Sequence, residues 1–535
     1  MSRQKTWWLA TALAALCLHP ALAQPQRPRS SMPDETAEEA MEAPSADAMP
    51  AAHDKAAASP KVEDRLVTTQ HHAVIGGRDI PYTVTAGTMI LRDEEGKPRA
   101  SIYFTSYTRD GVKDLGKRPI TYTYNGGPGS SSVWLHLGAF GPRRVALEEE
   151  GWAPAPPYHL EDNNESLLDI TDLVFIDPVT TGYSRAIPGK DAKKFYGLNE
   201  DAEAVADFIR LYTVRFGRWP SPKFLAGESY GTTRSAKLSH LLQQKHGIYL
   251  NGIVLLSTIL NFQTARFATG NDLPYPLFLP TYTASAWYHK KLPADLQQGG
   301  LKQALAEAER FATGEYASAL MKGSDLTEAE RRDIAGKLSR LTGLSQEYLL
   351  RVHLRPVIYS VVQEILRGEG ETMGRLDSRF RGIDHDTGEE FDYDPSYAAI
   401  LGPYSAALNH YVREDLGFRS ELPYEILTDR VGPWNYAPWN NQYLNVAEDL
   451  RKAMARNPAL QVFVANGYYD LATPYFATEY TFDHLGFEPG YRQRVTMGYY
   501  EAGHMMYIRR ADREKLKSDL AGFIRAVAEA GGEAR

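Results

Sequence analysis

The chain has 535 residues, and 43% of them are hydrophobic, which is ample for a large buried core. Its formal net charge is −8 and no basic block is interleaved with aromatic residues, so we expect no nucleic-acid partner. Length alone indicates about three domains, although a single α/β domain often exceeds that scale.

The N-terminus has the pattern of a secretory signal peptide. Arg3 and Lys5 precede an apolar run, Trp7–Leu18, which is too short to span a bilayer comfortably. A small-x-small cleavage signal, Ala21–Ala23, follows the run. No pair of Arg residues precedes the run, so the sequence does not indicate export by the twin-Arg route. We therefore expect residues 1–23 to be a Sec-type signal peptide and the mature protein to be periplasmic or secreted.

Cysteine usage and composition limit the chemistry of the mature chain. The one cysteine of the sequence, Cys17, lies inside the predicted signal peptide, so the mature chain would have no disulfide and no thiol nucleophile. Residues 24–64 are rich in Ala, Pro, Glu and Ser without an apolar period, and they predict a flexible tether. We expect no membrane span in the mature chain, since no later stretch has the necessary apolar length.

Strand patterns begin near Val67. Two stretches rich in β-branched and aromatic residues, Ile80–Ile90 and Ala100–Asp110, predict antiparallel strands. Short apolar strands then alternate with segments of helical spacing, which favours a mostly parallel sheet. The predicted strands are Pro119–Tyr124, Asp172–Asp177, Lys223–Gly227 and Gly252–Leu260, and the predicted helices are Glu200–Phe216 and Ser235–Lys245.

The alternation stops over residues 261–440, which contain helices and irregular aromatic loops, and it resumes after residue 440. We therefore predict an α/β fold, with a mostly parallel central sheet covered by helices on both faces. Residues 65–260 and 441–535 would form this core, and residues 261–440 would be a large, mainly helical cap inserted into it. The later predicted elements are the helices Val446–Arg456, Tyr475–Leu485 and Arg513–Ala530 and the strands Leu460–Gly467 and Arg492–Tyr500.

A G-x-S-x-G motif, Gly227–Gly231, lies between a predicted strand and a predicted helix, as a nucleophile elbow requires. Glycines at its ends would prevent collisions with neighbouring strands, and a strained turn would present the hydroxyl of Ser229. Such a match alone is weak, because an ordinary strand–helix turn can also have this pattern. Whether Ser229 is a nucleophile therefore depends on whether the chain also supplies a base, an orienting acid and oxyanion donors.

A nucleophilic serine needs a base and an orienting acid, and in α/β-hydrolase order both come after the serine, acid first. Asp470 comes directly after a predicted strand, and His504 comes after the next one. His484 also lies beyond Asp470, but no strand separates the two, so we interpret it as a helix-surface or packing residue. His136 is too early in the chain to be the base, and we expect it to pack or to line a pocket.

An oxyanion hole needs unobstructed backbone N–H groups. One should come from Tyr230, and the other from an early glycine-rich turn after a strand, which fits Thr123–Ser132. That turn lacks the spacing of a nucleotide-binding loop. The acidic stretch Gly382–Ser396 begins like a calcium loop, but Gly388 and Glu389 break the pattern. We expect a solvated loop there, and neither a metal nor a cofactor.

The chain resembles the serine carboxypeptidases, peptidase family S10, and specifically an exported bacterial member. The resemblance implies an α/β-hydrolase fold with an inserted cap, and hydrolysis of a C-terminal peptide bond with release of one amino acid. Its substrates would be peptides with a free C-terminus. The matching stretches occur in family order between Tyr82 and Ile524: NGGPGSSS, FIDPVTTGYS, GESYG, YLNVAEDLRKA, NGYYDLATP and EAGH.

The resemblance also implies roles for particular residues. It makes Ser229 the nucleophile, and Asp470 and His504 fall on the family's acid and base. It assigns the oxyanion donors to Gly127 and Tyr230. The substrate's terminal carboxylate would be bound by Asn125 and Glu228.

A carboxylate at Glu228 would repel the substrate carboxylate unless it is protonated, so we expect tighter binding of free-acid substrates at acidic pH. Two positions depart from the family pattern. Family members usually have a Cys where this chain has Ser130, and they commonly have a second Glu where it has Ala139. The missing acid counts against a strict exopeptidase preference more than against acyl chemistry, and two alternative functions stay open. These are an esterase or acyltransferase with the same triad, and a non-catalytic binding protein on the same fold. The sequence leaves the oligomeric state undetermined.

Overall fold

The computed structural model describes residues 62–383, 391, 393–486 and 490–533, with side chains described up to residue 530. The predicted signal peptide, nearly all of the predicted tether and most of the acidic stretch lie outside these residues. Across the described ranges, no helix combines the length and the apolar character needed to cross a membrane.

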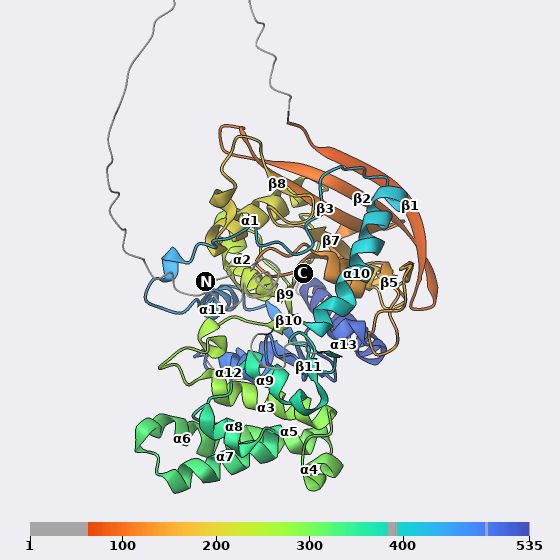
Figure 1. The fold of residues 1–535 in the computed structure, drawn as a ribbon. Helices are drawn as coiled ribbons and strands as arrows, with labels where there is room; N and C mark the ends of the chain where they lie inside the picture. Colours follow the sequence, from red (N-terminus) through yellow and green to blue (C-terminus); the bar gives the residue numbers. More distant parts are fainter. Residues whose placement is uncertain (1–61, 384–390, 392, 487–489, 534–535) are drawn as a thin grey trace, which may run out of the picture.

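A ten-stranded sheet forms the centre of the molecule (Figure 1). As predicted, β1, β2, β3 and β7 pair antiparallel in that order, and the pairs that follow along the sheet, β7–β4, β4–β9, β9–β10, β10–β13 and β13–β14, are parallel. β8 (Arg185–Ala186) pairs only with β3. In spatial order the other strands are β1 (Arg65–Ile75), β2 (Arg78–Arg92), β3 (Pro98–Arg109), β7 (Asp172–Ile176), β4 (Ile120–Tyr124), β9 (Lys223–Ser229), β10 (Gly252–Thr258), β13 (Gln461–Gly467) and β14 (Val495–Tyr500).

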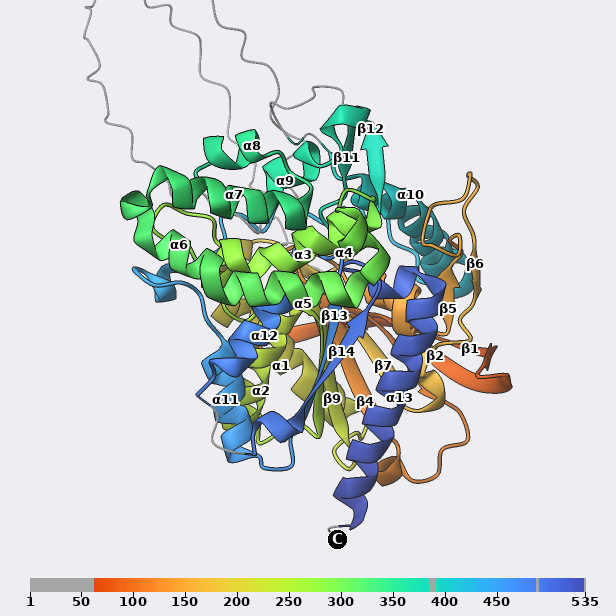
Figure 2. The same ribbon diagram turned by 90° about the horizontal axis from the view of Figure 1, so that it is seen from below.

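Helices cover both faces of this sheet, because side chains alternate across each strand. In β9, Phe224 and Ala226 point into one core, and Leu225 points into the other. Figure 2 shows α13 (Arg510–Glu533) crossing the first face. On the second face lie α1 (Leu198–Arg215), α2 (Tyr230–His246), α11 (Ala447–Arg456) and α12 (Tyr475–Asp483).

The segment between β10 and β13 is mainly helical, as predicted, and it has two parts. Helices α3 to α9 form a bundle around their own apolar core, at the opposite end of Figure 1 from β1 to β3. The longer α10 (Pro395–His410) instead packs into the first core of the sheet. The bundle helices are α3 (Pro274–Tyr288), α4 (Ala294–Gly299), α5 (Leu301–Phe311), α6 (Ala317–Lys322), α7 (Glu328–Thr342), α8 (Gln346–Arg351) and α9 (Ile358–Glu364).

Sequence periodicity did not predict a short antiparallel pair within this segment, β11 (Glu371–Met373) and β12 (Arg381–Ile383). Strands of three residues are too short to show an alternation of apolar and polar side chains. The loop between them passes beneath the carboxyl end of β14, where Leu376 O accepts a hydrogen bond from His504 N (2.7 Å). The insertion therefore reaches the edge of the sheet at which the predicted site residues lie.

Candidate active site

Ser229 is the last residue of β9 and precedes the first turn of α2. Its backbone has φ 59° and ψ −129°, a conformation that a residue with a side chain rarely adopts. Strain of this kind is retained where the surrounding structure enforces it, typically at functional sites. The side chain is 8% exposed and lines a pocket, so the turn presents the hydroxyl to a ligand-sized space.

Two glycines make this turn possible. A Cβ atom on Gly231 would lie 2.9 Å from Tyr124 O, at the end of β4. This is the collision with a neighbouring strand that the motif predicts. A Cβ atom on Gly227 would instead overlap the carbonyl oxygen of Gly231, across the turn itself. The glycines thus allow the close approach of strand and helix that orients Ser229.

We expect Gly227→Ala to destabilise the protein by about 1–3 kcal/mol or more, the usual range for overpacking, because the backbone it meets cannot move aside. Thermal or urea denaturation measures the effect. Gly314→Ala is the matched control, since a Cβ atom there meets nothing within 4 Å and its φ is not positive. Equal stability of the two variants would contradict this account of the elbow.

Asp470 and His504 form a buried pair at the ends of β13 and β14. His504 Nδ1 donates a hydrogen bond to Asp470 Oδ2 at 2.8 Å. The Asp470 carboxylate is fully buried and also accepts hydrogen bonds from Thr473 Oγ1 (2.6 Å), Thr473 N (3.0 Å) and Ala472 N (2.8 Å). Burial lowers the pKa of His504, but the charge and hydrogen bond of Asp470 outweigh it, so the pKa is raised overall.

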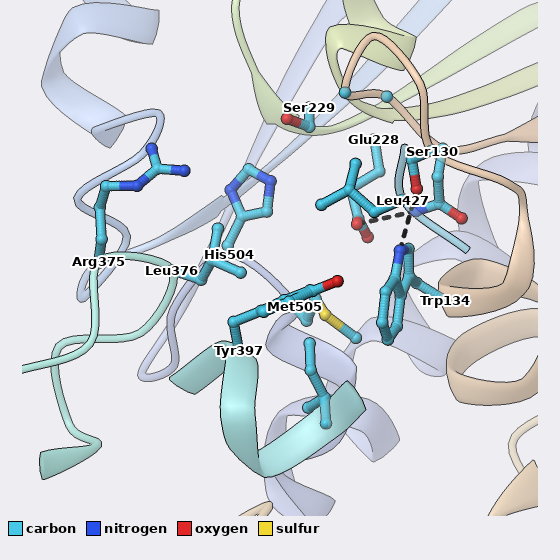
Figure 3. A pocket seen from close by; sticks show the side chains of 14 residues that line it. Ser130, Trp134, Glu228, Ser229, Arg375, Leu376, Tyr397, Leu427, His504 and Met505 are labelled. Carbon is cyan, nitrogen blue, oxygen red and sulfur yellow. Dashed lines mark hydrogen bonds between the residues drawn. The ribbon is translucent and has the colours of Figure 1, made fainter. Parts of the chain in front are cut away.

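Ser229 and His504 line the same pocket, and Figure 3 shows the Ser229 hydroxyl above the imidazole. Among the described residues, no direct hydrogen bond joins the Ser229 side chain to that ring. Catalytic hydrogen bonds of this kind are often long or poorly aligned in the absence of substrate. The structure therefore places Ser229 and His504 on the lining of one pocket, with Asp470 hydrogen-bonded to His504.

The glycine-rich turn after β4 packs directly against the elbow. A Cβ atom on Gly126 would overlap Tyr230 N, and Gly127 has φ 101°, so both positions need glycine. Arg234 holds the turn from below by donating to Asn125 O (2.7 Å), while it pairs with the buried Asp201. The structure gives the amide nitrogens of Gly127 and Tyr230 no hydrogen-bond acceptor among the described residues. Both amides are therefore available to an oxyanion.

Asn125 and Glu228 interact at the side of this turn. Asn125 Nδ2 donates to Glu228 Oε1 at 2.9 Å, and Leu135 N donates to Asn125 Oδ1 at 3.1 Å. Glu228 Oε2 is buried and has no hydrogen-bond partner among the described residues. Burial raises the pKa of Glu228 to about 7, with Asp470 adding to the shift and the hydrogen bond from Asn125 opposing it.

The Ser229 pocket joins these polar groups to an apolar wall (Figure 3). Glu228, the hydrogen-bond partner of Asn125, lies at one end together with the indole of Trp134. The insertion contributes Tyr397 and Ile400 of α10, which sequence patterns did not connect with the site. The pocket is lined by Asn125, Gly126, Gly127, Ser130, Trp134, Glu228, Ser229, Arg375, Leu376, Tyr397, Ile400, Leu427, His504 and Met505.

The other candidate histidines have structural environments. His484 is exposed, stacks on Tyr480 and contacts Tyr480 O through Nδ1 (2.8 Å), so it is a helix-surface residue. His136 is buried, hydrogen-bonded to Tyr107 Oη (2.6 Å) and stacked on Phe175. Burial lowers the pKa of His136 to about 3, so this residue is a neutral packing group.

A model described as serine carboxypeptidase matches residues 92–510. The chain belongs to this serine carboxypeptidase family. The elbow, the Asp470–His504 pair and the glycine-rich turn all lie within the matched region.

The individual relatives of the chain are distant in sequence. Serine carboxypeptidase-like 34 of Arabidopsis thaliana is 25% identical over 202 residues, 35% of this chain and 37% of the relative. Serine carboxypeptidase-like 33 of the same plant is 31% identical over 137 residues, 24% of this chain and 26% of the relative. The matches thus span well under half of these relatives.

Among solved structures, Kex1Δp of Saccharomyces cerevisiae, a prohormone-processing carboxypeptidase, has a TM-score of 0.52 and 18% identity. The likeness covers 84% of this chain and 91% of that chain. It shows that this chain has the α/β-hydrolase fold.

The two departures from the family pattern have local explanations. Ser130 Oγ accepts a hydrogen bond from Trp134 Nε1 (3.0 Å) and so supports the pocket wall. Ala139 is buried, and its carbonyl accepts from Asn163 Nδ2 (2.9 Å). No acid stands at this position, but the buried hydroxyl of Tyr507 is near enough to Glu228 to lower the pKa of that carboxyl.

Tyr404 of α10 is close to the same carboxyl, since burial raises the pKa of Tyr404 and the charge of Glu228 adds to the rise. A Cβ atom on Gly138 would touch both tyrosines, at the hydroxyl of Tyr404 and the ring of Tyr507. Tyr507 comes three residues after His504, so its place in the sequence, close to the predicted base, could have indicated that it lies near the site. Nothing in the sequence pattern indicated Tyr404.

Proposed function

We propose that the chain is a serine-type carboxypeptidase that releases the C-terminal amino acid of peptides through an acyl-enzyme intermediate. The observation that carries this proposal is the Ser229 pocket. It combines a strained serine, a histidine hydrogen-bonded to a buried carboxylate, and the Asn125–Glu228 pair on the same lining. A nucleophile with a base and an orienting acid performs acyl transfer, and the pair beside it selects a chain terminus.

The reaction is derived from these positions. Ser229 Oγ attacks the scissile carbonyl carbon while His504 Nε2 accepts the hydroxyl proton, and Asp470 stabilises the resulting imidazolium. The N–H groups of Gly127 and Tyr230 bind the oxyanion. His504 then protonates the leaving amine, the C–N bond breaks and the terminal amino acid departs. Water repeats the sequence on the acyl-enzyme and restores Ser229.

Preference for a chain terminus would come from the Asn125–Glu228 pair. Asn125 Nδ2 supplies an amide donor, and a protonated Glu228 supplies an O–H donor, so together they can hold both oxygens of a carboxylate. The apolar wall beside them, formed by Trp134, Tyr397 and Ile400, favours a large hydrophobic side chain on the departing residue. We therefore propose peptides that end in Phe, Leu or Met as preferred substrates.

Mass spectrometry of a peptide mixture after incubation tests the function. Free-acid peptides with apolar ends are expected to lose C-terminal residues one at a time, and their amidated counterparts are expected to stay intact. Peptides ending in Asp or Lys should be shortened more slowly. Hydrolysis of acyl esters without any peptide shortening would contradict the proposal and favour an esterase.

We also propose that the protein is exported, on the basis of the predicted signal peptide of residues 1–23. N-terminal sequencing of the protein purified from the medium or periplasm should then begin at Gln24. A protein that keeps Met1 and stays in the cytoplasm would contradict this.

A further inference from the structure

Arg375 is a buried cation in the lining of the Ser229 pocket. It lies in the loop between β11 and β12 and is 3% exposed. The structure gives its side chain no ion pair and no hydrogen bond within the described part of the chain, and its Nε atom is buried without a partner. A guanidinium removed from water is costly unless an anion or a set of acceptors compensates for the loss.

Three acids that lie near Arg375 in the described part of the chain do not supply this compensation, because each has other partners. Asp377 is held by Arg379, through Nη2 to Oδ2 at 2.7 Å and Nε to Oδ1 at 3.0 Å. Asp394 accepts hydrogen bonds from Leu376 N and Ser396 N. Asp470 is the partner of His504. The charge of Arg375 is therefore left for a ligand of the pocket.

Its position indicates which part of a substrate it would meet. Figure 3 shows Arg375 and Glu228 on opposite sides of the His504 imidazole. Their charges act on the pKa of His504 in opposite directions, so both are close enough to be felt there. If the departing residue occupies the end with Glu228 and Asn125, the residue before the scissile bond extends towards Arg375.

We propose that Arg375 forms an anion-binding subsite on the acyl side of the scissile bond, which selects peptides with Glu or Asp immediately before the C-terminal residue. This subsite rests on the proposed carboxypeptidase function. A carboxylate matches the planar fork of a guanidinium and can accept two parallel hydrogen bonds from it. Because the pocket shields both groups from water, the ion pair between the guanidinium and the carboxylate is stronger there than in bulk water.

Steady-state kinetics with matched free-acid peptides tests the subsite. The peptides differ only in the penultimate residue, which is Glu, Gln or Lys, and all end in Phe. For the unmodified protein, kcat/KM is expected to be about tenfold or more higher for Glu than for Gln, the effect of one charged hydrogen bond. The Lys peptide should be the poorest substrate, because a second cation would be buried beside Arg375.

Arg375→Gln is expected to remove the preference for Glu over Gln, measured as the ratio of the two kcat/KM values, since this variant keeps a polar side chain but loses the charge. Arg375→Lys should keep part of the preference, because it keeps the charge and loses the fork. Arg332→Gln, at an exposed position of α7, is the matched control and should change neither ratio.

The outcomes separate this subsite from the function on which it rests. If the unmodified protein shortens the Glu and Gln peptides equally well, the subsite is wrong and the carboxypeptidase function stands. Retention of the Glu preference in Arg375→Gln would also overturn the subsite. If none of the peptides is shortened, the proposed function itself fails. The comparison of the Glu, Gln and Lys peptides on the unmodified protein still tests the subsite if Arg375→Gln does not fold.

Discussion

Ser229→Ala is expected to lower kcat for peptide hydrolysis by about 10⁵-fold, because the nucleophile is lost while the oxyanion donors and the binding pocket remain. The folded structure should be unaffected, since Ala removes one oxygen atom and leaves the backbone conformation of the elbow unchanged. Single-turnover assays with a free-acid peptide measure the loss. Ser318→Ala, at an exposed position of α6, is the control and should retain full activity.

Asp470→Asn tests the other end of the triad. Both oxygens of Asp470 accept hydrogen bonds, from His504 and Thr473 on one side and from backbone N–H groups on the other. An amide must direct its NH₂ group at one of these sets of donors, so the variant should lose about 10⁴-fold in kcat and also some thermal stability. Normal activity in either Ser229→Ala or Asp470→Asn would contradict the triad.

Binding of free-acid peptides is expected to weaken as the pH rises through the pKa of Glu228, about 7. Below that pH the carboxyl is neutral and donates to the substrate carboxylate, and above it two negative charges repel each other. If only the neutral form binds, the dissociation constant should rise about tenfold between pH 6 and pH 8. Isothermal titration of the Ser229→Ala variant measures this binding without turnover.

Two comparisons isolate Glu228 from the other titrating groups nearby, His504, Asp470, Tyr404 and Tyr507. An amidated peptide has no terminal charge, so its binding should depend little on pH. Glu228→Gln keeps a donor and an acceptor without a charge, and should make binding of the free acid nearly independent of pH. A steep pH dependence that persists in Glu228→Gln would assign the effect to another group.

The same carboxyl should affect folding stability. Its pKa is 4.5 for the unfolded chain and about 7 in the folded protein, so between these values the folded state binds more protons. Stability from this group is therefore present at low pH and lost as the pH rises through this window, by about 3 kcal/mol in total. Glu228→Gln should accordingly be more stable than the unmodified protein at pH 8, and similar to it at pH 4.

Local sequence determined much of this molecule. The alternation of apolar strands and helices predicted the central sheet, because residues buried on both faces of a parallel strand form short continuous apolar runs. The glycines around Ser229 predicted the elbow. The places of Asp470 and His504 after successive strands predicted a shared site, since parallel strands end at the same edge of a sheet.

Only the tertiary structure decided what surrounds these groups. Tyr404 and Tyr397 are on α10, and Arg375 is on a short loop, all separated from Glu228 by well over a hundred residues. Periodicity indicates that a side chain is buried, but it does not say which distant segment packs against it. The apolar wall, the tyrosines near Glu228 and the unpaired guanidinium arise from contacts between the insertion and the sheet, so they required the folded chain.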